Sequence, residues 1–177
     1  MEPVTSEALK IFLQRLGERY PNPAEFYLLG GSALCLLGSS RETLDVDYTF
    51  ELNPEQTEEF QSTLEKLGTE LKLDLESVPL GEFIPLPPEA RQRRRIIGHF
   101  GNLDVYIFDL YSIALSKIAR GFEADIEDVL FLLTQKLIDF GELERLYKII
   151  LPLASASDID PKEFRVYFEE VRHRWAA

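Results

Sequence analysis

The chain has 177 residues, of which 45% are apolar and 11% aromatic. This length and composition match one compact domain, or a core with a helical appendix, and they exclude a wholly disordered chain. Asp and Glu number 31 against 19 Lys and Arg, and the net charge of −12 disfavours indiscriminate binding to nucleic-acid backbones. Cys35 is the only cysteine, which excludes an internal disulfide and a four-cysteine zinc site.

The chain has no sequence feature of a membrane protein. Polar residues follow Met1, and no uncharged apolar run reaches the roughly 18 residues of a membrane span. We therefore expect a soluble, cytoplasmic protein that makes no membrane contact.

The first part of the chain alternates between helical and strand patterns. Apolar residues at helical spacing predict an opening helix from Ser6 that Pro21 and Pro23 end. The apolar run 26–29 predicts a buried strand, which a glycine turn and a short helix follow. Alternation over 44–52 predicts a second strand.

The middle of the chain predicts a further helix, a loop and more strands. A helix is expected from Pro54 to Gly68, and Leu71, Leu73 and Leu75 then alternate with polar residues, as in a half-buried strand. Four prolines predict a surface loop over 79–88. Gly101 and Asn102 separate two strand-like runs and predict a hairpin.

From Tyr111 onward the spacing of apolar residues is helical. We therefore expect an α/β (α+β) fold, in which a mixed sheet flanked by helices occupies residues 1–110. Residues 111–177 are expected to form a helical extension packed on that core, the whole being one compact unit.

The stretch from Phe26 to Phe50 is the most informative for function. A strand followed by Gly30, Gly31 and Ser32 lets backbone approach a ligand, and a helix N-terminus offers N–H groups to phosphate oxygens. An ordinary tight turn is the alternative.

Asp45 and Asp47 lie two residues apart on the second predicted strand. Both carboxylates therefore project from one face of the strand and can share a divalent cation. A solvent-facing acidic strand is the alternative. Together, a phosphate cradle and paired carboxylates are what metal-assisted transfer of a nucleotidyl or phosphoryl group requires.

These residues resemble the signature of the DNA polymerase β-like nucleotidyltransferase superfamily, a Gly-Gly or Gly-Ser turn followed by Asp-x-Asp on the next strand. The spacing of Arg41, Thr43, Asp45 and Asp47 and the later stretch LSKIARGFEADIEDVLFLL resemble small bacterial members related to abortive-infection toxin nucleotidyltransferases. The resemblance implies a nucleotidyltransferase-like fold, Mg²⁺ as cofactor and an NTP as substrate.

The resemblance also implies a third carboxylate on a neighbouring strand. Asp104 is the candidate, because it lies just past the predicted hairpin turn and interrupts a face that holds Tyr106 and Phe108. Asp109 is the second candidate, with a helix cap as its other interpretation. Asp45, Asp47 and Asp104 are thus the expected metal ligands and catalytic residues, with Asp104 as general base.

Further nucleotide contacts are expected from basic residues. The resemblance assigns Arg41 and Lys117 to nucleotide binding, because related proteins carry a lysine followed by acidic residues in the region of Lys117, Asp125 and Asp128. A surface salt-bridge set on two amphipathic helices is the alternative.

The expected function is transfer of NMP from an NTP to an acceptor, which is an RNA, a protein side chain or a small molecule. The alternative is a catalytically inactive binding or regulatory protein of the same fold, for instance one partner of a toxin–antitoxin pair with an antitoxin-like protein. An unrelated α/β protein in which both motifs are coincidental is the third possibility.

Overall fold

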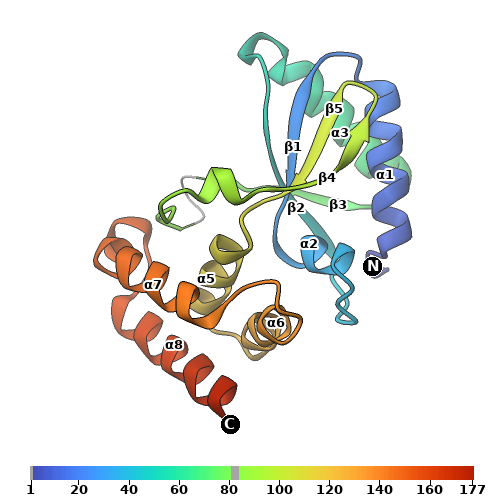
Figure 1. Ribbon diagram of the computed structural model, residues 1–177. Coiled ribbons are helices and arrows are strands. Elements are labelled where there is room, and N and C mark those ends of the chain that lie inside the picture. Colours follow the sequence, from blue (N-terminus) through green and yellow to red (C-terminus); the bar gives the residue numbers. More distant parts are fainter. Residues whose placement is uncertain (1, 81–83) are drawn as a thin grey trace. The chain divides into compact units, whose positions relative to one another are not determined.

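Five strands form one sheet in the computed structural model, which describes residues 2–80 and 84–177 (Figure 1). The strand order is β3-β2-β1-β5-β4. The strands are β1 (Ala24–Leu28), β2 (Asp45–Glu51), β3 (Asp74–Ser77), β4 (Arg95–Phe100) and β5 (Leu103–Ile107). β1 pairs antiparallel with β2 and parallel with β5, whereas β3 runs parallel to β2 and β4 antiparallel to β5. The expected mixed sheet and the hairpin at Gly101 and Asn102 are confirmed.

The chain divides into two compact units. The sheet unit comprises Met1–Val78 and Arg95–Phe108, and the helical unit comprises Pro79–Arg94 and Asp109–Ala177. Among the described residues, no helix combines the length and apolarity needed to cross a membrane.

One face of the sheet is packed against two helices, α1 (Ser6–Arg19) and α3 (Thr57–Leu71). The ring of Phe26 on β1 lies 6.0 Å from that of Phe12 on α1 and 6.3 Å from that of Phe60 on α3. All three side chains are fully buried, and burying rings of this size supplies much of the stability of a core. β1 is an interior strand, as its unbroken apolar run predicts.

The helix that follows β1 begins earlier than expected. α2 (Gly30–Leu36) includes both glycines, and Leu29 precedes it as an N-cap residue without a side-chain cap. Gly30 has φ +57°, a conformation that glycine adopts at little cost. The glycines thus form the first turn of the helix rather than a separate loop.

The helix after β2 ends later than expected. A short 3-10 turn, η1 (Pro54–Gln56), precedes α3, which continues past Gly68 until Lys72 takes a left-handed conformation. At Gly68 an added Cβ would lie 3.2 Å from the backbone oxygen of Leu73, so the missing side chain permits close packing here and does not end the helix. Because α3 extends to Leu71, β3 begins only at Asp74 and is shorter than the strand expected from Leu71 onward.

The helical unit contains α5 (Leu110–Arg120), α6 (Glu123–Thr134), α7 (Phe140–Ile150) and α8 (Pro161–Ala176), with 3-10 turns η2 (Ala90–Arg93) and η3 (Leu151–Ser157). Asp109, Asp139 and Asp160 cap α5, α7 and α8 through their carboxylates. The rings of Tyr147 and Phe168 stack at 3.8 Å between α7 and α8. The predicted loop over 79–88 lies partly outside the described residues, and residues 84–88 form neither a helix nor a strand.

Candidate active site

Three carboxylates meet on the face of the sheet opposite α1 and α3. Asp45 and Asp47 project from β2, and Glu76 projects from the adjacent strand β3. The parallel register places Asp47 opposite Glu76, and ligand oxygens of the three residues lie within 4.8 Å of one another. Two unit charges at that separation repel by on the order of 3 kcal/mol at an effective dielectric constant of about 20. A divalent cation among them would relieve this repulsion.

The glycine turn lies directly against this acidic group. A Cβ added to Gly30 would sit 2.3 Å from Oδ2 of Asp47, and one added to Gly31 would sit 2.8 Å from Oγ1 of Thr43. A side chain at either position would therefore displace Asp47 or Thr43, and at Gly30 it would also meet an unfavourable backbone conformation. The two parts of the sequence motif, which are separated by the remainder of α2 and its following loop, are neighbours in the structure.

Ser32 contributes to this turn through its backbone and not through a free hydroxyl. The residue is fully buried, and its Oγ donates a hydrogen bond of 2.9 Å to the backbone oxygen of Leu29. This bond fixes the first turn of α2, whose leading N–H groups have no partners within the helix.

Thr43 supports Asp45 from the residue just before the strand. Its Oγ1 lies 3.4 Å from Oδ1 and 3.3 Å from the backbone oxygen of the aspartate. The backbone of Thr43 also pairs with Val4, whose N–H donates to the oxygen of Thr43 at 2.7 Å. Arg41 lies two residues earlier, exposed in the segment between α2 and β2.

Glu76 was not among the expected metal ligands. The alternation of leucines with polar residues predicts that it lies on the polar face of a strand, but local sequence does not tell which strand is the neighbour. Only the parallel pairing of β3 with β2 brings Glu76 to Asp47.

Asp104, the expected third carboxylate, does not belong to this acidic group in the described part of the chain. It lies on the same face of the sheet but on β5, where it is opposite Glu25 of β1. Glu25 in turn is opposite Glu51 of β2. Glu51 is four residues beyond Asp47, or about 13 Å along the strand at roughly 3.3 Å per residue. Instead, Oδ1 of Asp104 lies 2.6 Å from Nδ1 of His99, on the neighbouring strand.

Asp109, the second candidate, has a structural role within the helical unit. Its fully buried carboxylate accepts hydrogen bonds from the N–H groups of Tyr111 and Ser112 at the start of α5. Arg93 adds a two-pronged ion pair, with Nε and Nη2 each 2.8 Å from a carboxylate oxygen. Hydrogen bonding to Asp109 raises the pKa of the Arg93 guanidinium. The charge of Arg93 is therefore paired within the helical unit.

Lys117 lies inside the helical unit, between α5 and α6. The residue is 5% exposed, and its Nζ is 2.8 Å from Oδ2 of Asp128 and 3.7 Å from Oδ1 of Asp125. Asp125 also receives a two-pronged contact from Arg120. The salt-bridge alternative thus describes the contacts of Lys117, except that the network is buried and not on the surface.

Comparisons with known proteins show the fold and the family of this chain. A solved structure of an antigenic nucleotidyltransferase-like protein from Paracoccidioides brasiliensis is similar in fold, with a TM-score of 0.50 and 18% sequence identity over 76% of this chain and 79% of that chain. A search of curated proteins gave no match. The family model of nucleotidyltransferases of unknown function (DUF6036) matches residues 7–176. The chain therefore belongs to this nucleotidyltransferase family.

Proposed function

We propose that this protein transfers a nucleoside monophosphate from an NTP to an acceptor hydroxyl or phosphate with the aid of Mg²⁺. The observation that carries the proposal is the contact between the Gly30 turn and Asp47, inside a group of three carboxylates. This juxtaposition places backbone suited to phosphates beside oxygens suited to a metal. Membership of a nucleotidyltransferase family supports it.

The acidic group fits the proposed cofactor. Mg²⁺ prefers oxygen ligands and is commonly held by one or two carboxylates together with substrate phosphates. We assign Asp45, Asp47 and Glu76 as its ligands, in place of a set that contains Asp104. When bound, Mg²⁺ would offset negative charge on the phosphates and on the attacking oxygen.

The remaining roles follow from exposure and position. Backbone N–H groups at Gly30, Gly31 and Ser32 would hold phosphate oxygens, and exposed Arg41 would add a positive charge. Glu76, the most exposed of the three carboxylates, is suited to accept the proton of the acceptor hydroxyl. That oxygen bonds to the α-phosphorus as pyrophosphate leaves. Lys117 has no part in this assignment because two aspartates already pair with it.

The acceptor is defined only by class. A net charge of −12 disfavours RNA and favours a protein side chain or a small molecule. A finer relation to abortive-infection toxins, with an antitoxin-like partner, rests on the residue pattern from Arg41 to Asp47.

The proposal is tested by incubating the protein with each NTP, radiolabelled at its α-phosphate, and a cell lysate as the pool of acceptors. We expect Mg²⁺-dependent transfer of label that falls by about 100-fold or more in Asp45→Asn and in Asp47→Asn. Asp74→Asn is the matched control, because Asp74 lies opposite Asp45 on β3 but outside the acidic group. Label transfer that survives both site substitutions would refute the assignment, and no transfer by the unmodified protein would favour the binding-protein alternative.

A further inference from the structure

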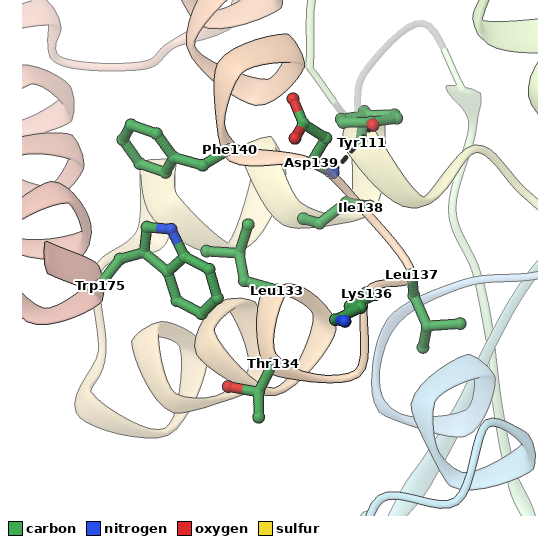
Figure 2. A pocket seen from close by; sticks show the side chains of 9 residues that line it. All are labelled: Tyr111, Leu133, Thr134, Lys136, Leu137, Ile138, Asp139, Phe140 and Trp175. Atoms are coloured by element: carbon green, nitrogen blue, oxygen red, sulfur yellow. Dashed lines mark hydrogen bonds between the residues drawn. The ribbon is translucent and has the colours of Figure 1, made fainter.

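The helical unit contains a pocket that the proposed reaction does not use. It has a volume of about 530 Å³ and lies where the ends of α6 and α8 meet the start of α7 (Figure 2). Its lining includes Tyr111, Leu133, Lys136, Asp139, Phe140 and Trp175. The volume falls within the range of about 300 to 1,000 Å³ that is typical of small-molecule sites.

Aromatic and aliphatic side chains form much of the lining. Trp175 is 41% exposed, whereas Leu133 is buried, and Figure 2 shows both side chains lining the pocket. Phe140 stacks on Phe168 at 5.9 Å, and the Arg172 guanidinium lies 5.5 Å from the Phe140 ring. Phe140 is therefore held in place by its neighbours. A lining that holds both an exposed tryptophan and a fixed phenylalanine ring suits a flat aromatic ligand.

Backbone hydrogen bonds hold the loop that forms another wall. The N–H of Asp139 donates to the Tyr111 hydroxyl at 3.0 Å, a contact drawn in Figure 2. The N–H groups of Lys136 and Leu137 donate to carbonyl oxygens at the end of α6, each at 3.0 Å. A pocket with such fixed walls loses little entropy on binding.

The charged residues of the lining are one lysine and one aspartate, and the lysine is the one that can contact an anion. Lys136 is the only cation among the described residues that line it, and within residues 2–80 and 84–177 it forms no ion pair. Lys136 follows Gln135, the C-cap residue of α6, and has a left-handed backbone with φ +57°. The one lining carboxylate, Asp139, is engaged as the cap of α7, where it accepts from the N–H of Glu142 at 2.9 Å.

From these features we propose that the pocket binds a nucleoside monophosphate group, with the base against Trp175 and the phosphate at Lys136. The inference rests on the proposed function: if the protein uses nucleotides, a nucleotide is the planar aromatic anion that we expect in this pocket. The group is either a free nucleotide or the end of a strand.

The test uses Trp175, the only tryptophan of the chain, as an intrinsic fluorescence reporter. AMP is titrated in EDTA into the Asp45→Asn/Asp47→Asn double variant of the full chain, so that the metal site does not contribute. We expect saturable quenching by AMP and much weaker binding of adenosine and of ribose 5-phosphate, each of which lacks one recognised part. A short 5′-phosphorylated oligoadenylate serves as the second arm, and tighter binding of it than of AMP identifies a strand end.

Lys136→Gln should weaken AMP binding by about fivefold to tenfold while leaving adenosine unchanged. Lys148→Gln, which removes an exposed lysine of α7, is the matched control and should have no effect. Equal melting temperatures show that both variants are folded. No saturable quenching by AMP or the oligoadenylate, or equal binding by Lys136→Gln, would overturn the inference. Because the readout needs neither Mg²⁺ nor transfer, its failure is distinguishable from failure of the proposed function.

Discussion

Gly30 has both a left-handed backbone conformation and a direct contact with the acidic group. Its left-handed φ and the 2.3 Å between a hypothetical Cβ and Oδ2 of Asp47 mean that a side chain here would displace the carboxylate. The sequence motif therefore has a steric explanation in addition to the backbone freedom of glycine.

We expect Gly30→Ala to lower nucleotidyl transfer by about 100-fold, because displacement of a ligand by even 1 Å disturbs the reacting geometry. Backbone strain should cost about 1 kcal/mol of unfolding free energy. Gly38→Ala is the control, since Gly38 has φ +94° but a Cβ added there would meet nothing within 4 Å. Chemical denaturation and the radiolabel assay are measured on both. Equal loss of activity in the two variants would show that strain alone, and not contact with Asp47, is responsible.

Lys117 illustrates how a motif residue can have a structural role. We expect Lys117→Met to lower the unfolding free energy by about 3 to 5 kcal/mol, because Asp125 and Asp128 would lose a buried counter-charge. Lys148→Met removes an exposed lysine, 3.8 Å from Glu144, and should cost less than about 1 kcal/mol. Denaturant titration gives both values. An unchanged stability with reduced NTP affinity would instead support the nucleotide-binding role that the sequence resemblance implies.

At the scale of elements, ion pairs link consecutive helices of the helical unit. Glu144 of α7 is hydrogen-bonded by Arg172 of α8, and Lys148 lies nearby. Hydrogen bonding to Arg172 lowers the pKa of the Glu144 carboxyl below its ordinary value. A carboxylate with a lowered folded-state pKa stabilises the protein above its unfolded-state pKa, and this contribution is lost as the pH falls.

Glu144→Gln should therefore reduce stability at neutral pH, by less than about 1 kcal/mol because the pair is near the surface. The difference from the unmodified protein should shrink below about pH 4.3, the ordinary pKa of glutamate, as the pH falls through the lowered folded-state value. Urea unfolding across this pH range measures it. Glu127→Gln, at an exposed glutamate of α6 without an ion pair among the described residues, is the control. A constant difference at all pH values would exclude an electrostatic origin.

Most elements of this fold were predictable because their signals are local. Thr5 and Ser6 opened the first helix as expected, since a capping side chain and the spacing of apolar residues act within one or two turns. The end of α3 was not predictable, because Gly68 is a glycine for packing against the next segment, a contact that residue spacing does not encode.

At the scale of the whole molecule, the order of strands decides which carboxylates meet. Asp45 and Asp47 were predictable as a pair, since they alternate on one strand. Their third partner depended on sheet topology: β3 returns parallel beside β2, whereas β5 lies beyond β1. Asp104 was expected because it lies just past the hairpin turn on a neighbouring strand, but the register places it level with Glu51 and not with Asp47.

The choice between Glu76 and Asp104 as third metal ligand can be tested through the response of the protein to Mg²⁺. Mg²⁺ should raise the melting temperature of the unmodified protein, since a ligand that binds only the folded state stabilises it. Glu76→Gln should abolish most of this rise, whereas Asp104→Asn, which neutralises a carboxylate on the same face of the sheet, should retain it. In EDTA the Glu76→Gln variant should be at least as stable as the unmodified protein, because one of three mutually repelling charges is removed. Differential scanning fluorimetry with and without Mg²⁺ measures all these changes. The opposite pattern, in which Asp104→Asn loses the Mg²⁺ response and Glu76→Gln keeps it, would contradict the assignment of Glu76 and make Asp104 on β5 the third metal ligand.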